Sequence, residues 1–279
     1  MTKPTWIGFD LRVVQAFAWL LPVTLLLIPA AAGAQERDDD HDEGHLHFSH
    51  PLVTESPSPD TKIRLDNIAT NSSDGPGFHE NTIRIEGEYA FTHSVSLAMV
   101  TPFIFRTAPS DERASGIGDV ELSLKAASLA YAENGILLGG GLSVGVPTGS
   151  DVKAIGSSHI VELEPFVDAA YKRHELELVT FARFSSTVHR RANEEAERNL
   201  AFDFSALYRI HPRLETLLEL TTERSLVASD VGAPQTFIAP GLKMYPFSNK
   251  QIMFGASLEL GTGAARHQQS ILVSGFYHF

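Results

Sequence analysis

Four histidines lie in a short acidic segment near the start of the chain. They are His41, His45, His47 and His50, and carboxylates at positions 38–40, 42 and 43 surround them. Imidazoles with nearby carboxylates ligate zinc, copper or nickel, and His45 and His47 can chelate one ion together in an extended chain. The alternative is a solvated tail whose histidines bind nothing. Residues 35–59 are too polar and proline-rich to build a core, so we expect a mobile or loosely docked segment.

Two serine–histidine pairs have the residue types that a lipid hydrolase embedded in a barrel would need. Ser158 precedes His159, and Ser185 lies near His189 in sequence. Such chemistry needs a serine or water activated by a positioned histidine. Adjacent residues of a strand point to opposite faces, so Ser158 and His159 are expected to diverge. The sequence shows no nucleophile elbow, phosphate-binding loop or metalloprotease helix, and we expect neither catalysis nor a cofactor.

Charged residues recur through the rest of the chain, where they alternate with apolar residues. This pattern predicts a polar interior in which acid outweighs base, so that cations are attracted and anions repelled. The charges can instead pair across strands and fill a narrow barrel, and we favour a narrow path with internal charge pairs. The residues expected to line the lumen and set its selectivity are Arg84, Glu86, Glu88, Glu121, Lys125, Glu162, Glu164, Asp168, Arg183, Asp203, Arg209, Glu215 and Glu219.

The elements that must position these charges are alternating runs of about ten residues, the length of a tilted membrane strand. Twelve runs predict an all-β fold, an antiparallel transmembrane barrel over residues 60–279. Pro102, Pro165 and Pro240 fall inside expected strands, where each removes a ladder donor, and they predict bulges near the rims or misplaced strand limits. The runs lie near residues 63–65, 83–91, 95–105, 120–126, 136–146, 161–169, 176–184, 200–208, 214–223, 236–245, 252–260 and 271–279.

The connections between these runs alternate between short and long. Tight turns at one rim and long loops at the other are typical of outer-membrane barrels, with the tight turns in the periplasm. An even strand number then places both termini in the periplasm. An aromatic residue also precedes almost every short turn, as expected for a ring of aromatics at the lipid–water boundary. These residues are Phe91, Tyr131, Tyr171, Tyr208, Tyr245 and Tyr277.

The two ends of the chain carry targeting features. Lys3 and Arg12 precede an apolar run and the small residues at 32–34, the layout of a cleaved signal peptide over residues 1–34, although an uncleaved anchor is the alternative. The formal net charge is −12, which argues against nucleic-acid binding. The last residues alternate and end in Tyr277 and Phe279. An aromatic carboxyl terminus resembles the signal that the outer-membrane barrel assembly machinery reads; the alternative is an edge strand of a soluble sheet.

Three stretches carry a resemblance to a known family. They are residues 45–62, Gly116-Ile-Gly-Asp-Val-Glu-Leu-Ser-Leu-Lys125 and Gly141-Leu-Ser-Val-Gly-Val-Pro-Thr-Gly149. The chain resembles outer-membrane barrels named as transporters of the phenol meta-cleavage pathway, which are distantly similar to fatty-acid and aromatic-hydrocarbon channels. The resemblance implies a barrel over about residues 45–279 and a transport role, and it supplies no site residues.

Together these features predict an outer-membrane channel of a Gram-negative bacterium that passes a small solute, passively or with a gate. Its expected partners are membrane lipid, the barrel assembly machinery and an unidentified solute. The first alternative is transport linked to divalent metal ions gathered by the histidine-rich segment. The second alternative is a lipid hydrolase.

Overall fold

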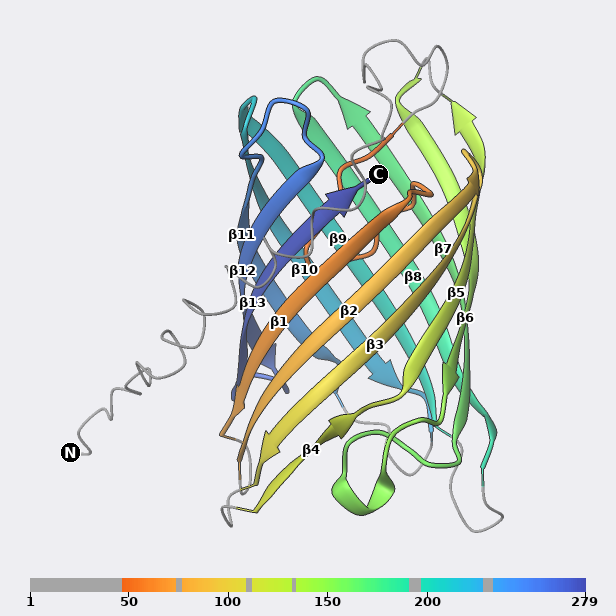
Figure 1. Cartoon of the computed structure of the whole chain (residues 1–279), viewed down its shortest axis with the longest axis vertical. Coiled ribbons are helices and arrows are strands. Elements are labelled where there is room, and N and C mark those ends of the chain that lie inside the picture. The colour runs from red at the N-terminus through yellow and green to blue at the C-terminus, as the bar shows by residue number, and fades with distance from the viewer. Residues whose placement is uncertain (1–46, 74–76, 109–111, 132–133, 191–196, 228–232) are drawn as a thin grey trace, which may run out of the picture. The chain divides into compact units, whose positions relative to one another are not determined.

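A computed structural model describes residues 47–73, 77–108, 112–131, 134–190, 197–227 and 233–279. The expected signal peptide, His41 and His45 lie outside these residues. The described residues form one antiparallel sheet that curls into a barrel (Figure 1). Its strands are β1 (Lys62–Ser72), β2 (Phe78–Thr92), β3 (Val95–Thr107), β4 (Arg113–Ile117), β5 (Val120–Tyr131), β6 (Ile136–Val146), β7 (Val161–Arg173), β8 (Leu176–His189), β9 (Arg198–His211), β10 (Leu214–Ser225), β11 (Gln235–Met244), β12 (Ile252–Gly263) and β13 (Gln268–His278).

The barrel closes where the last strand meets the first. β13 pairs antiparallel with β1, from His278 opposite Lys62 to Gln268 opposite Ser72. Among the described residues, twelve strands follow one another round the wall in chain order, and the thirteenth, β4, pairs only with one end of β3. The predicted all-β, twelve-stranded antiparallel barrel is therefore confirmed. The sequence placed β4 in a loop, because its five residues are too few to show an alternating pattern.

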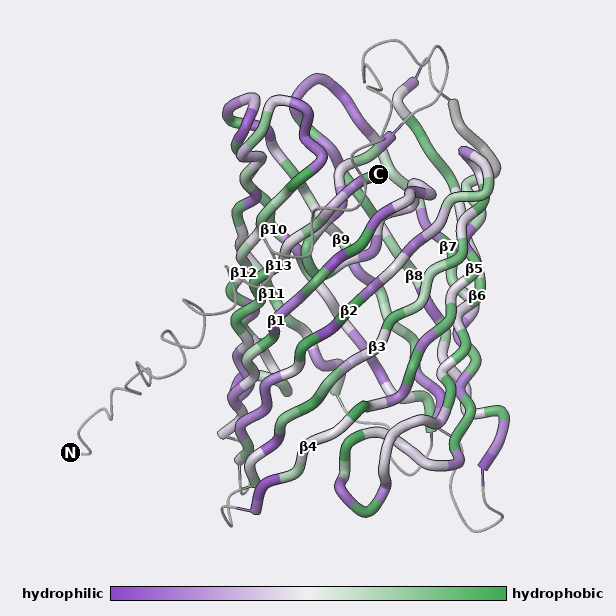
Figure 2. The backbone as a smooth tube through the Cα atoms, viewed as in Figure 1, coloured by the Kyte–Doolittle hydropathy of each residue, from purple (hydrophilic) through white to green (hydrophobic). Residues whose placement is uncertain are grey.

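Alternation along each strand gives the barrel two chemically different surfaces, visible as alternating bands of hydropathy in Figure 2. Apolar side chains such as Ile63 and Leu124 point outward and are 49% and 52% exposed. Charged side chains such as Arg64 and Glu86 point inward and are each 2% exposed. This is the reverse of a soluble protein and suits a wall bathed in hydrocarbon. In the part of the chain that the structure describes, no helix is long and apolar enough to cross a membrane.

Short and long connections lie at opposite rims. Two residues join β2 to β3, β7 to β8 and β9 to β10, at the rim where β1 starts and β13 ends. The long connection between β6 and β7 lies at the other rim and carries a short 3₁₀ helix, η2 (Asp151–Lys153), at the bottom of Figure 1. We call these the short-turn rim and the long-loop rim.

The prolines occupy interrupted positions of the ladder rather than bulges. Pro165 pairs with β6, but the β7–β8 ladder skips it between Leu163 and Phe166 without a register change. Pro240 likewise pairs with β10 and interrupts the β11–β12 ladder with its register intact. Pro102 lies where the partner of β3 changes from β5 to β4. The predicted bulges are therefore wrong for Pro165 and Pro240: a missing donor removes ladder bonds locally without shifting the strands.

Candidate functional site

Residues 47–60 run through the inside of the barrel, and we call them the plug. Phe48, Leu52 and Thr54 are at most 1% exposed. The expectation of a mobile or loosely docked segment is therefore wrong for residues 47–59. The reason is that the lumen is itself polar, so a polar segment finds hydrogen-bonding partners there instead of needing a core of its own.

The strongest anchor of the plug is Glu219 of β10. Its carboxylate accepts backbone N–H bonds from Leu52 (3.3 Å), Val53 (3.0 Å to each oxygen) and Thr54 (2.9 Å). The hydroxyl of Ser205 donates to the same carboxylate at 3.0 Å. Glu219 is fully buried. Three consecutive N–H groups around one carboxylate form the kind of backbone nest that holds anions, here with the anion supplied by the wall.

Other wall residues bind the plug along its length, mostly through its backbone. Carboxylates of the wall accept from N–H and hydroxyl groups of the plug, and cationic side chains of the wall donate to its carbonyl oxygens. The contacts are Lys172 Nζ to His47 O (3.2 Å), Ser49 N to Glu177 Oε2 (2.7 Å), Ser49 Oγ to Glu215 Oε1 (3.4 Å), Arg64 Nη2 to Leu52 O, Lys125 Nζ to Ser56 O (2.8 Å) and Asp60 N to Glu88 Oε1 (3.3 Å).

Two apolar side chains fix the plug against the wall. Phe48 and Leu52 belong to a buried cluster with Leu207, Met253 and other inward apolar residues. Leu52 lies over Gly255 of β12, where an added Cβ would come within 2.4 Å of Leu52 Cδ2. Glycine at 255 thus leaves room for Leu52, which a larger residue would push aside.

The charged residues expected in the lumen point inward, and most of them pair. Arg84, Glu86, Glu88, Lys125, Arg183, Asp203 and Glu215 take part in ion pairs there. The sequence did not single out their partners Lys62, Arg64, Asp66 and Lys243, although all four show the same alternation. The pairs are Lys62 with Glu86 (3.0 Å) and Glu88 (2.6 Å), Asp66 with Arg64 (2.8 Å) and Arg84 (2.6 Å), Lys125 with Glu88 (3.5 Å), Lys172 with Glu177 (2.9 Å), Arg183 with Asp203 (3.6 Å) and Lys243 with Glu215 (2.5 Å).

Near the long-loop rim, the barrel holds an acidic cavity of about 240 Å³, which we call the vestibule. Glu162, Glu164 and Glu223 line it, together with Arg183 and Glu197. Glu121 lies nearby on β5 and accepts a hydrogen bond from Ser123 at 3.0 Å. Four carboxylates against one guanidinium give the vestibule an excess of negative charge, which favours cations over anions.

Four of the expected lumen residues have buried polar atoms that make no hydrogen bond within the described part of the chain. These atoms are Oε2 of Glu86, both carboxylate oxygens of Asp168, Oδ1 of Asp203 and Nε of Arg209. Buried polar atoms are almost always paired, with water where protein groups are lacking.

A histidine cluster lies at the short-turn rim, where the plug meets β1 and β13. The ring nitrogens of His47, His50 and His278 face one oxygen of Asp60, at 3.6, 3.0 and 2.6 Å. Burial and the nearby Lys62 charge hold the pKa of His50 well below its usual range. Burial alone would raise the pKa of Asp60, but hydrogen bonds from the three imidazoles lower it well below its usual range.

Comparison with solved structures identifies the kind of barrel. A COG4313 outer membrane channel from Pseudomonas putida F1 is 13% identical over 79% of this chain and 96% of its own, with a TM-score of 0.59. The NanC porin is 12% identical over 77% of this chain and 100% of its own, with a TM-score of 0.56. The KdgM porin, solved in complex with disordered oligogalacturonate, is 12% identical over 78% and 99%, with a TM-score of 0.50. The fold is that of an outer-membrane β-barrel.

At identities this low, the similarity establishes the fold alone and does not identify the transported solute. No protein family and no curated protein matches the sequence. The resemblance to transporters of the phenol meta-cleavage pathway is therefore supported only as far as the outer-membrane barrel fold.

The candidate serine–histidine pairs do not form a catalytic arrangement. Ser158 and His159 lie in the β6–β7 connection and not on a strand, so the expectation that they diverge is wrong. Nδ1 of His159 faces both Asp151 Oδ2 (3.1 Å) and Ser158 Oγ (3.5 Å) on the long-loop rim. A triad needs one ring nitrogen for the acid and the other for the serine. Ser158 moreover donates its hydroxyl hydrogen to Asp151. Ser185 faces the lumen whereas His189 is exposed at the end of β8.

The residues expected to serve as an assembly signal lie on the outer surface. Tyr277 and Phe279 pack edge to face with ring centroids 4.9 Å apart, and Phe279 is 50% exposed. In the predicted aromatic ring, Phe91 and Tyr208 are also exposed, at 59% and 52%. Tyr245 is the exception, because it points inward, is 8% exposed and donates to Glu215 at 3.4 Å.

Proposed function

We propose that the protein is an outer-membrane channel for a small hydrophilic solute and that the plug is its gate. The observation that carries this proposal is the way the plug is held. It is bound by hydrogen bonds and two apolar anchors, with no covalent link along residues 47–60. Removing it would leave a lumen lined by ion pairs and carboxylates, which water can fill.

The distribution of charge favours a cationic or neutral solute. The vestibule offers four carboxylates and one guanidinium. Asp168 and Asp203 add buried carboxylate oxygens without protein partners. A lining of this kind disfavours anions and supports a cationic or neutral polar solute.

The location and orientation follow from the two surfaces of the wall. The outward apolar face suits the outer membrane, and the short-turn rim, with both barrel termini, is the periplasmic side in barrels of this class. The proteins of similar fold are named as an outer membrane channel and as porins. Membrane lipid and the barrel assembly machinery are accordingly its expected partners.

Electrical recording in planar bilayers tests the gate directly. The purified protein should show rare, brief openings, whereas a variant lacking residues 47–58 should stay open. The reversal potential of this deletion variant in a potassium chloride gradient should show cation preference, because the carboxylates of the barrel wall remain. Phe48→Ala with Leu52→Ala is a second variant that loosens the plug at full length. Closed behaviour of all three proteins, each with the heat-shifted gel mobility of a folded barrel, would refute the proposal.

A further inference from the structure

We propose that His47, His50, Asp60 and His278 bind a divalent transition-metal ion, such as Zn²⁺, that locks the plug to the wall. The first part concerns the binding site alone. The second part, the lock, rests on the proposed function of the plug as a gate.

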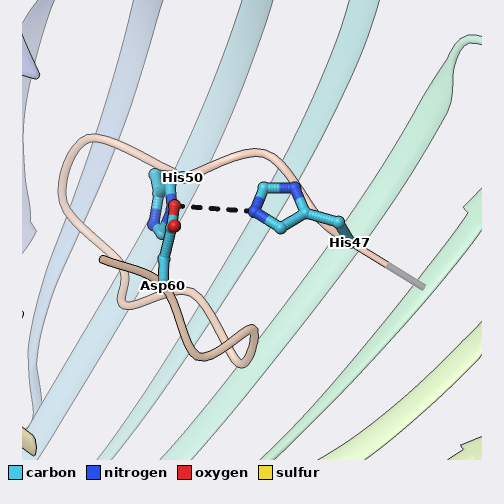
Figure 3. A group of neighbouring side chains, drawn as sticks. All are labelled: His47, His50 and Asp60. Carbon is cyan, nitrogen blue, oxygen red and sulfur yellow. Dashed lines mark hydrogen bonds and ion pairs between the residues drawn. The ribbon is translucent and has the colours of Figure 1, made fainter. Parts of the chain in front are cut away.

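The geometry is that of a ligand set gathered round one point. The ligand atoms of His47, His50 and Asp60 lie within 4.8 Å of one another, and Figure 3 shows these side chains converging. His278 adds a third imidazole, with Nδ1 2.6 Å from Asp60 Oδ2. In a tetrahedral zinc site the ligand atoms are about 3.3 Å apart, which follows from metal–ligand bonds of about 2.0 Å. The three nitrogens lie 2.6–3.6 Å from that oxygen. His47, His50 and Asp60 form the compact group, and a turn of the His278 ring would bring its Nδ1 in as the fourth ligand.

The donor set selects the class of metal. Three neutral imidazoles and one carboxylate suit Zn²⁺, Cu²⁺ or Ni²⁺ and suit Ca²⁺ and Mg²⁺ poorly. His47 gives access to the ion, since its side chain is 58% exposed, whereas that of His50 is 4% exposed. A binding site with one open side and one buried side admits an ion and then shields it.

Lys62 is a neighbouring cation whose charge opposes a bound metal ion. Its Nζ is 3.3 Å from His50 Nδ1, the nitrogen that carries a hydrogen once Nε2 binds a metal. Glu88 and Glu86 also bind this Nζ, at 2.6 and 3.0 Å. Lys62 can therefore turn fully to these carboxylates and release His50 without losing its charge partners.

The four ligands come from parts of the chain that separate when the plug leaves. His47 and His50 lie near the start of the plug, Asp60 is its last residue, two positions before β1, and His278 ends β13. A bound ion would cross-link the plug to the closing seam of the barrel. An ion that binds only the docked plug multiplies the docked-to-undocked ratio by one plus its concentration over its dissociation constant, about a hundredfold at a hundred times that constant.

Zinc titration tests the site without any transport measurement. The background protein carries His41→Ala and His45→Ala, so that the tail histidines do not contribute. Titration against a chromophoric chelator should show one tight Zn²⁺ equivalent. His278→Ala and His50→Ala should each weaken it by more than about tenfold. The matched control is His174→Asn in the β7–β8 turn of the same rim, where φ is +54° and asparagine is tolerated. His50→Ala changes only the plug and leaves the strands intact. It therefore tests the site even if the His278→Ala barrel fails to assemble.

Equal zinc affinity in the background, His278→Ala and His50→Ala proteins would overturn the site. For the lock, Zn²⁺ should reduce the open probability of the background protein and leave that of His50→Ala unchanged. Tight binding without this reduction would overturn the lock and leave the site in place. If the variant lacking residues 47–58 never conducts, the channel function and the lock fail together, while the titration still decides the site.

Discussion

Replacing Glu219 by glutamine should release the plug, because this carboxylate holds three consecutive backbone N–H groups of the plug. In glutamine one oxygen stays an acceptor for Val53 and Thr54, and the other becomes an NH₂ group that faces the donors of Leu52 and Val53. The exchange loses one to two hydrogen bonds to a charged acceptor, each contributing about 1.5–3 kcal/mol. We expect the docking free energy of the plug to fall by about 3 kcal/mol, roughly a hundredfold in the docking equilibrium.

The chain has no cysteine, so a single introduced thiol reports plug release cleanly. Ser56 is 1% exposed inside the barrel and is close in size to cysteine. The cysteine of Ser56→Cys should react with a membrane-impermeant maleimide about a hundred times faster when Glu219→Gln is also present. Glu223→Gln is the matched control, because Glu223 lies on the same face of β10 and lines the vestibule instead of binding the plug. Equal labelling rates in the Glu219→Gln and Glu223→Gln proteins would show that packing, not this carboxylate, holds the plug.

Three further substitutions test separate parts of the lumen. Gly255→Ala places a methyl group 2.4 Å from Leu52 Cδ2 and should loosen the plug by about 1–3 kcal/mol, seen as faster labelling that Leu52→Ala reverses. Lys243→Met leaves Glu215 buried without its 2.5 Å partner and should cost about 3–5 kcal/mol, seen as a lower denaturant midpoint that Glu215→Gln largely restores. Glu164→Gln in the plug-deleted channel should lower the cation-to-anion permeability ratio without changing stability; an unchanged ratio would remove the vestibule from any role in selectivity.

The barrel could be predicted from the sequence because its two surfaces impose a period of two on every strand. Ile63 and Leu65 face outward while Lys62, Arg64 and Asp66 face inward, and the same rule places Glu215 and Glu219. Which charged side chains form ion pairs with one another could not be predicted in this way. Asp66 binds Arg64 on its own strand and Arg84 on the next, and that choice depends on register and side-chain reach.

Tyr245 shows where pattern reading fails at a single position. It follows the last residue of β11 and fits the spacing of the predicted aromatic ring, but it turns inward to Glu215 and Lys243. A tyrosine suits either place, because its ring is apolar and its hydroxyl needs a partner. The buried ion pair beside it supplies that partner, and the local sequence does not indicate this inward orientation.

The plug illustrates a physical limit of hydropathy arguments in barrels. Composition predicted that residues 35–59 could not build a core and would be mobile or loosely docked, because stable packing in a soluble protein needs an apolar core. Inside this barrel the surroundings of residues 47–60 are carboxylates, ammonium groups and hydroxyls, so serines and free backbone groups are satisfied there. The signal that could have indicated docking is the pair Phe48 and Leu52, four residues apart in an otherwise polar segment, since both are fully buried. In a chain with a polar lumen, isolated apolar residues in a polar leader therefore indicate where the leader packs against the wall.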